Sequence, residues 1–273
     1  MDQPTSHWVH DLSPFLVQFS DTLGIRYYGL AYLLGFGLGG WILFNAAKRR
    51  RLDLAPPAVA DLMTALVIGV IVGGRLGYFV FYEPMTIVRD PLQLLKVWEG
   101  GMASHGGFIG VGVAMTWFAR KHNTSFRGLA DATIAVAPLG VGLGRTANFI
   151  NGELWGRVTD VSWGVIFPAS GRAGASLAEI APRHPSQIYA AALEGFLLFG
   201  YLQWRYWRTD AQPGRITGEF LIIYAIARMI TEMFREPDAE LIFGLTRGSF
   251  YSIFMIVAGL IMIKRSNALR KTS

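Results

Sequence analysis

The chain contains no cysteine among its 273 residues. This absence excludes disulfides, thiolate metal ligands and an enzyme-borne thiol nucleophile, so any sulfur chemistry must come from a substrate. Charged residues are also scarce, at 16% of the chain against 52% hydrophobic residues, whereas soluble domains carry about 25% charged residues. The composition therefore predicts an integral membrane protein.

The net charge is +6, which could suggest a nucleic-acid partner. The basic residues instead stand at the ends of apolar segments, as is typical of lipid-embedded helices, so we expect no nucleic acid to bind. No Lys or Arg precedes Arg26, and no small-residue cleavage site follows a basic region. We therefore expect the first apolar span to be retained rather than removed as a signal peptide.

Seven apolar stretches approach the ~20 residues needed to cross ~30 Å of hydrocarbon. They cover about residues 24–46, 60–82, 103–119, 129–149, 187–204, 216–234 and 249–263. The loops after the first, third, fifth and seventh stretches hold twice as many Lys and Arg residues as those on the other side, which places the N-terminus outside and the C-terminus in the cytoplasm. The predicted fold class is an all-α polytopic membrane protein with seven transmembrane helices.

The remaining segments divide the chain further. We expect an interfacial arm on the outer side at 1–23, transmembrane helices 1–4 within 24–150, a small extracytoplasmic head at 151–186, transmembrane helices 5–7 within 187–264 and a cytoplasmic tail at 265–273. A strand-like run at 163–167 falls in the head. Gly69, Gly73 and Gly77 recur at four-residue spacing and predict close helix packing rather than chemistry.

The unusual polar side chains all fall in the outer half of the predicted spans. Residues 144–157 alone carry two arginines, two asparagines and a glutamate at the end of a span. Such groups cost free energy at the edge of the hydrocarbon unless they face a cavity or each other, so we predict one outward-facing site. Its predicted members are Tyr28, Arg75, His105, Arg145, Asn148, Asn151, Glu153, Gly156, Tyr224, Arg228, Glu232 and Arg235.

The polar residues of the sixth span help to predict that this site carries a net positive charge. At ~100° per residue, Tyr224, Arg228, Glu232 and Arg235, at the outer half of this span and its end, project within an arc of ~80°. The four-residue spacing of Arg228 and Glu232 could also mean only an ion pair that ties helices together. Because arginines outnumber acids across the predicted set, we expect an anionic ligand, and a guanidinium fork matches phosphate geometry.

Two histidines leave alternatives open. His105 lies beside glycines at a span edge, where it could be a hydrogen-bonded structural residue or a general base. His184 and Ser186 stand just before the fifth span, and we predict that they cap that helix.

Four segments together carry a resemblance to a known family. The run GRTANFINGELWG at 144–156 resembles the signature of bacterial prolipoprotein diacylglyceryl transferases, and RHPSQIY at 183–189, HGG at 105–107 and FREPD at 234–238 resemble its companion motifs. The resemblance implies transfer of the diacylglyceryl group from phosphatidylglycerol to the lipobox cysteine thiol of a prolipoprotein, with release of glycerol phosphate. It also implies a bacterial cytoplasmic (inner) membrane enzyme, with its site facing the outer leaflet and without metal or cofactor.

The same resemblance assigns roles to residues. It implies that the essential residues are Tyr28, His105, Arg145, Asn148, Glu153, Gly156, Tyr224, Arg228 and Glu232. We expect Arg145 and Arg228 to bind the lipid phosphate, and Asn148 and Tyr28 to orient the head group. Glu153 and Glu232 would position the arginines or accept hydrogen bonds from head-group hydroxyls, and His105 is the nominated base for the thiol. Ala147 stands where the family commonly has glycine, and the head loop is shorter than in some members.

Other functional classes fit the sequence less well. A transporter or channel for an anionic solute predicts polar residues at the midplane and in both leaflets, and inverted repeats between halves; neither is visible. A retinal protein would need a lysine in the last span, and 250–263 has none. A serine hydrolase would want a Gly-x-Ser-x-Gly element, whereas Ser104 lies in Met-Ala-Ser-His.

Overall fold

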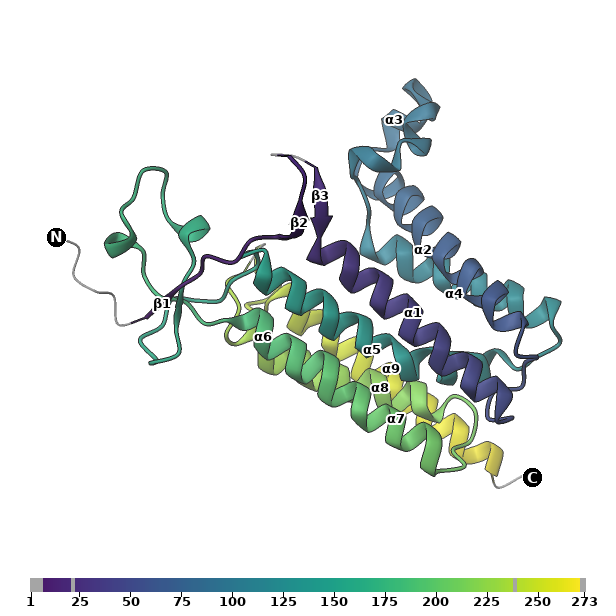
Figure 1. Ribbon diagram of the computed structural model, residues 1–273. Helices are drawn as coiled ribbons and strands as arrows, with labels where there is room; N and C mark the ends of the chain where they lie inside the picture. Colours follow the sequence, from purple (N-terminus) through teal and green to yellow (C-terminus); the bar gives the residue numbers. More distant parts are fainter. Residues whose placement is uncertain (1–6, 21–22, 238–239, 271–273) are drawn as a thin grey trace. The chain divides into compact units, whose positions relative to one another are not determined.

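A computed structural model describes residues 7–20, 23–237 and 240–270 (Figure 1). Parts of the predicted arm (1–6 and 21–22), Asp238 of the FREPD motif and the last three residues of the predicted tail lie outside the described residues. The chain divides into two compact units. Unit 1 comprises residues 1–39 and 133–273, and unit 2 comprises residues 40–132.

The described chain is mostly helical. Six long α-helices are α1 (Tyr27–Lys48), α2 (Ala58–Tyr82), α4 (Ser104–Lys121), α5 (Phe126–Ile150), α8 (Arg215–Glu232) and α9 (Arg247–Arg270). A further helical stretch runs through α6 (Ser186–Ala190), a π-helical segment (Ala191–Leu197) and α7 (Leu198–Arg208). Among the described residues, α1, α2, α5 and α9 are long and apolar enough to cross a membrane, so the chain is a helical membrane protein.

Most helix boundaries differ from the prediction by a few residues, and residues 24–26, predicted to begin the first helix, form a short strand instead. Helix α8 ends at Glu232, so Arg235, predicted to continue its polar face, lies beyond the helix and pairs through its backbone with Gly156. Helix α9 extends well past the predicted 249–263, because Lys and Arg are good helix formers and prolong the helix beyond its apolar run. The apolar pattern locates a helix core but not its ends.

In unit 2, α2 packs against α4 through glycine. A Cβ at Gly73 would overlap the backbone of Gly106, and a Cβ at Gly110 would overlap that of Gly69. The predicted packing role of the α2 glycines is therefore confirmed. Between the two helices the chain forms α3 (Pro84–Arg89) and two 3₁₀ turns, η1 (Pro91–Leu95) and η2 (Val97–Glu99).

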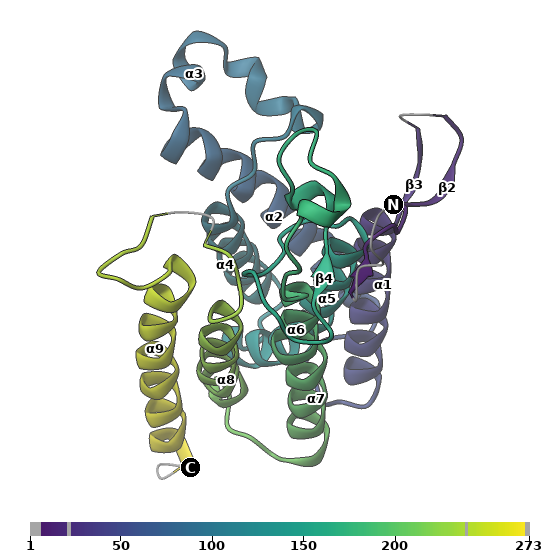
Figure 2. The same cartoon turned by 90° about the vertical axis from the view of Figure 1, so that its left-hand side faces the viewer.

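In unit 1, four short strands form two small sheets. Strands β2 (Phe15–Gln18) and β3 (Gly24–Arg26) form an antiparallel hairpin that leads into α1, whereas β1 (Trp8–Val9) pairs in parallel with β4 (Val165–Ile166). The strand predicted at 163–167 is thus confirmed, but only over two residues. Figures 1 and 2 both draw the segment between α5 and α6 beyond the ends of these two helices, and Figure 2 labels β4 within it.

Candidate functional site

The signature run forms a tight turn at the end of α5. The side-chain amides of Asn148 and Asn151 both donate to Oε1 of Glu153, at 2.8 and 3.2 Å, and the Glu153 N–H donates to the Asn148 carbonyl at 3.1 Å. Gly152 adopts φ +66°, a conformation that strains residues with a side chain. The turn therefore fixes the Glu153 carboxylate against the buried end of the helix.

The start of α6 holds this turn from outside. The Gln187 amide, 2% exposed, donates to the Glu153 carbonyl at 2.7 Å, and the Ser186 hydroxyl donates to the Leu154 carbonyl at 3.2 Å. The N-cap of α6 is Pro185, with no capping bond from a side chain, so the predicted capping by His184 and Ser186 is wrong. The Ser186 hydroxyl instead satisfies a carbonyl from a distant segment.

The segment after α8 completes the arrangement. Gly156 pairs with Arg235, and its N–H donates to the His184 carbonyl at 2.9 Å. A Cβ at Gly156 would lie 2.6 Å from that carbonyl oxygen and would overlap the carbonyl of Phe234. Only glycine fits where these three segments cross, which is a structural reason for the last residue of the signature run.

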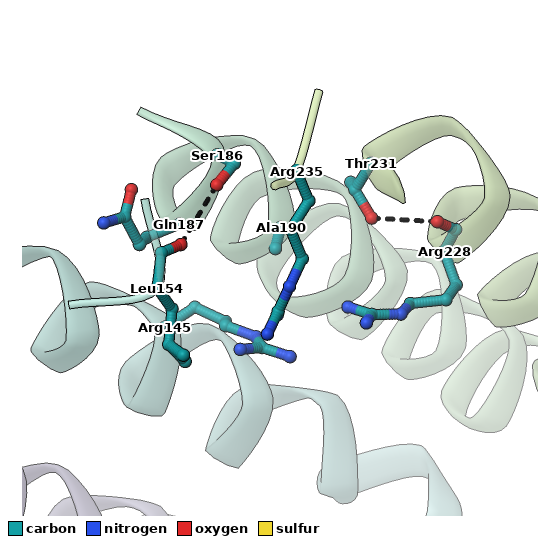
Figure 3. Close-up of a pocket in the computed structure, with 8 residues that line it drawn as sticks. All are labelled: Arg145, Leu154, Ser186, Gln187, Ala190, Arg228, Thr231 and Arg235. Atoms are coloured by element: carbon teal, nitrogen blue, oxygen red, sulfur yellow. Dashed lines mark hydrogen bonds between the residues drawn. The ribbon is translucent and has the colours of Figure 1, made fainter. Parts of the chain in front are cut away.

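Three arginines gather beside this crossing. Figure 3 shows Arg145 from α5, Arg228 from α8 and Arg235 from the segment after α8, with their guanidinium groups pointing toward one another. The cavity between them has a volume of about 10 Å³, room for one water molecule. Its lining consists of Arg145, Leu154, Ser186, Gln187, Ala190, Arg228, Thr231 and Arg235. Lining side chains would have to move for a phosphodiester to enter.

Arg145 differs from Arg228 in its partners. Within the described part of the chain, the half-buried Arg145 guanidinium has no hydrogen bond or ion pair. It does interact electrostatically with the charges of Glu194, Arg228 and Arg235. Arg228 makes a close ion pair with Glu232 and approaches Glu194 at 3.4 Å. The ion pair that the spacing of Arg228 and Glu232 left open is present, and Arg145 retains donors for an anion.

Glu194 is missing from the predicted site. It is 0% exposed and lies in the π-helical segment Ala191–Leu197, a feature that often marks functional sites. Its Oε1 accepts a short hydrogen bond from the Thr231 hydroxyl, and its buried Oε2 has no hydrogen-bond partner among the residues that the structure describes. The available signal was an acid in the middle of an apolar span.

Two predicted tyrosines occupy different places. Tyr224 lies one turn before Arg228, stacks on Phe220 at 5.4 Å between ring centroids and interacts electrostatically with Glu194 and Arg145. Tyr28 lies in the first turn of α1 and packs edge-on against Tyr32 at 5.1 Å. Tyr28 is not among the side chains that line the described cavity.

The remaining predicted residues, Arg75 and His105, belong to unit 2. Arg75 is 4% exposed, and its guanidinium donates to five backbone carbonyls of that unit. His105 is exposed in the first turn of α4. Within the described residues, no group of three or more His, Asp or Glu side chains is placed to hold a metal ion.

Comparison with known proteins relates the whole chain to one family. The family profile described as Prolipoprotein diacylglyceryl transferase matches residues 14–265. The chain is 43% identical over 268 residues to the phosphatidylglycerol–prolipoprotein diacylglyceryl transferase of Aeromonas hydrophila, covering 96% of this chain and 93% of the relative. It is 46% identical over 248 residues to the protein of the same name from Solidesulfovibrio magneticus, covering 89% of this chain and 91% of that relative.

Proposed function

The chain belongs to the prolipoprotein diacylglyceryl transferase family, and we propose that its arginine cavity binds the phosphate of phosphatidylglycerol. The reaction of the family moves the diacylglyceryl group of phosphatidylglycerol to a prolipoprotein. We propose that the acceptor is the thiol of a lipobox cysteine. This fits a chain that has no cysteine of its own. Family membership also favours a transferase over the transporter alternative.

The proposed step exchanges one bond for another. The thiolate sulfur attacks the glyceryl carbon, a carbon–sulfur thioether bond forms, and the bond from that carbon to the phosphate oxygen breaks. The oxygen keeps the electron pair and leaves as glycerol phosphate, so the phosphate gains one negative charge. The thiol proton goes to a base, for which we propose His105.

The observation that carries this proposal is Arg145. A half-buried guanidinium without an ion-pair partner among the described residues, facing two further arginines, matches a phosphate that gains charge as it leaves. Donors already in place around developing charge stabilise the transition state more than the substrate. Arg228, tied to Glu232, supplies a second guanidinium with a defined position.

Other predicted residues are proposed to support this site. Asn148 and Asn151 hold Glu153 in the signature turn, and we propose that this turn and Tyr28 orient the glycerol head group. Gly156 allows Arg235 to approach from the segment after α8. Tyr224 lies close to Glu194 and Arg145, where its hydroxyl would reach a bound head group.

We further propose the orientation of the enzyme in its membrane. Seven helical stretches cross the bacterial cytoplasmic (inner) membrane, with the N-terminus and the head segment 151–186 outside. Four apolar helices support the membrane location. The cavity then faces the outer leaflet, where the membrane lipid and the prolipoprotein signal peptide meet.

The test uses purified protein, phosphatidylglycerol and a lipobox peptide, with mass spectrometry to detect an added diacylglyceryl group. We expect the native chain to modify the peptide and Arg145→Gln to lower kcat by about 10²-fold or more, the loss typical of removing one stabilising donor. The matched control is Arg172→Gln in the head, since Arg172 does not line the cavity. Transfer by Arg145→Gln at the native rate would refute the phosphate site.

A further inference from the structure

The guanidinium of Arg75 is saturated by the segment that connects α2 to α4. Nε donates at 3.2 Å, Nη1 makes one close bond and one at 3.2 Å, and Nη2 donates at 2.5 and 2.8 Å. The acceptors are the backbone carbonyls of Gln93, Leu94, Lys96, Gly100 and Gly101. Five donors meet five carbonyls, which is the full capacity of an arginine.

The connecting segment has little else to hold it. Helix α3 and the turns η1 and η2 have no buried residue, and apolar side chains such as Trp98, 77% exposed, point away from the unit's interior. The carbonyls of Gln93 and Lys96 also accept from the N–H groups of Lys96 and Glu99, both at 3.2 Å. Arg75 adds a second donor to these two carbonyls and a donor to the other three, and its guanidinium lies 4.7 Å from the Phe79 ring.

The same contacts determine where α4 begins. Gly100 and Gly101 adopt φ +82° and +73°, and the chain then passes to Ala103, whose N–H donates to the Gly74 carbonyl at 2.9 Å. His105 is the second residue of α4. The Arg75 side chain therefore hydrogen-bonds to the chain before and at the Gly100–Gly101 turn, and the Gly74 carbonyl hydrogen-bonds to it after the turn, two residues before His105.

We propose that Arg75 is a positioning residue that sets the placement of His105, and not a ligand of the lipid phosphate. A phosphate could reach this guanidinium only after several of these hydrogen bonds break, and each broken bond costs free energy. The inference rests on the proposed role of His105 as base. It replaces the prediction from the sequence that Arg75 binds the substrate.

Kinetics separate the two roles. Arg75→Lys keeps the positive charge but loses the planar fork that serves five carbonyls. A positioning role predicts that kcat falls by about tenfold or more while KM for phosphatidylglycerol changes by less than about twofold. A phosphate ligand predicts the reverse, a raised KM with native kcat, and that result would overturn the proposal. Arg89→Gln, on the exposed face of α3, is the matched control and should leave both constants unchanged.

A second variant disturbs the hydrogen bonds between Arg75 and the connecting segment without changing Arg75 itself. Gly101→Ala places a Cβ 2.8 Å from Nη1 of Arg75 at a residue with φ +73°. We expect it to lower kcat as Arg75→Lys does. Native kcat in Gly101→Ala would count against positioning.

A structural readout does not depend on the transferase activity. Because the chain has no cysteine, a spin label on Leu92→Cys reports the mobility of the connecting segment alone. We expect the label to become more mobile in Arg75→Lys, while a label on Leu16→Cys in β2 stays unchanged. An unchanged Leu92 spectrum would overturn the proposal, whereas absence of transfer in the native chain would refute only the proposed function.

Discussion

Nε2 of His10 lies 2.7 Å from the carbonyl oxygen of Phe149, which is 139 residues further along the chain. The Phe149 carbonyl also accepts from the Gly152 N–H at 2.9 Å, and His10, 7% exposed, gives it a second donor. Its ring packs 5.3 Å from that of Phe167 and would touch a Cβ at Gly152. The N-terminal arm therefore fixes the helix end that carries Arg145.

Replacing His10 tests this connection. His10→Phe cannot donate, but the Phe149 carbonyl keeps its bond from the Gly152 N–H, so we expect the free energy of unfolding to fall by about 1 kcal/mol, the net contribution of one hydrogen bond. His10→Gln can still donate and should recover part of the loss. Thermal melts of the purified protein measure both. Equal melting temperatures for the two variants would contradict a role for the hydrogen bond.

We expect Glu194 to stabilise the folded protein through its charge and through the space that its side chain fills. Glu194→Ala removes a partner of Arg228 and the acceptor of Thr231, so we expect about 3 kcal/mol of destabilisation, as for a broken buried pair. Glu194→Gln still accepts from Thr231 and should lose less. The exposed Glu240→Ala provides the control. If Glu194→Ala melts like the native protein, the buried pair does not stabilise the fold.

Gly156 should tolerate no side chain. In Gly156→Ala the added Cβ meets the carbonyls of His184 and Phe234, so we expect a loss of about 2 kcal/mol or more, typical of overpacking, together with reduced transfer. Gly200→Ala in α7 has open space and should be neutral or slightly stabilising, because alanine favours a helix over glycine. Equal melting temperatures and equal rates of peptide modification for Gly156→Ala and Gly200→Ala would contradict this prediction.

The head should lose stability in acid because of His184. Burial lowers the pKa of His184, although the charge of Asp160 acts in the opposite direction. The folded head thus binds this proton less readily than the unfolded chain, whose histidine has a pKa of about 6.5. Stability is therefore retained above about pH 6.5 and falls as the pH drops below it.

Thermal melts between pH 7.5 and pH 5.5 measure this effect. We expect the melting temperature to fall with pH, and to fall less in His184→Gln, which cannot be protonated. Loss of the contact between His184 and Tyr189 would add an offset that does not vary with pH. Parallel curves for the two proteins would show that His184 does not cause the acid sensitivity.

The sequence by itself determined the positions of the helix cores and one local contact. Apolar runs located α2 and α5, because a membrane helix needs a long stretch of apolar side chains. The glycines of α2 predicted close helix packing without identifying α4 as the partner, and the spacing of Arg228 and Glu232 allowed their ion pair. Each of these follows from neighbours a few residues apart, whose relative positions a helix fixes.

Only the tertiary structure decided which partners distant segments supply. In the folded chain, the Arg75 guanidinium donates to five backbone carbonyls, and the Ser186 hydroxyl donates to a carbonyl of the signature turn instead of capping a helix. The buried Glu194 lies next to Arg228. Spacing along the chain gives the depth and face of a side chain. It does not give the groups that other segments bring to it, and in a buried place those groups determine whether a charge is paired or left to bind a ligand.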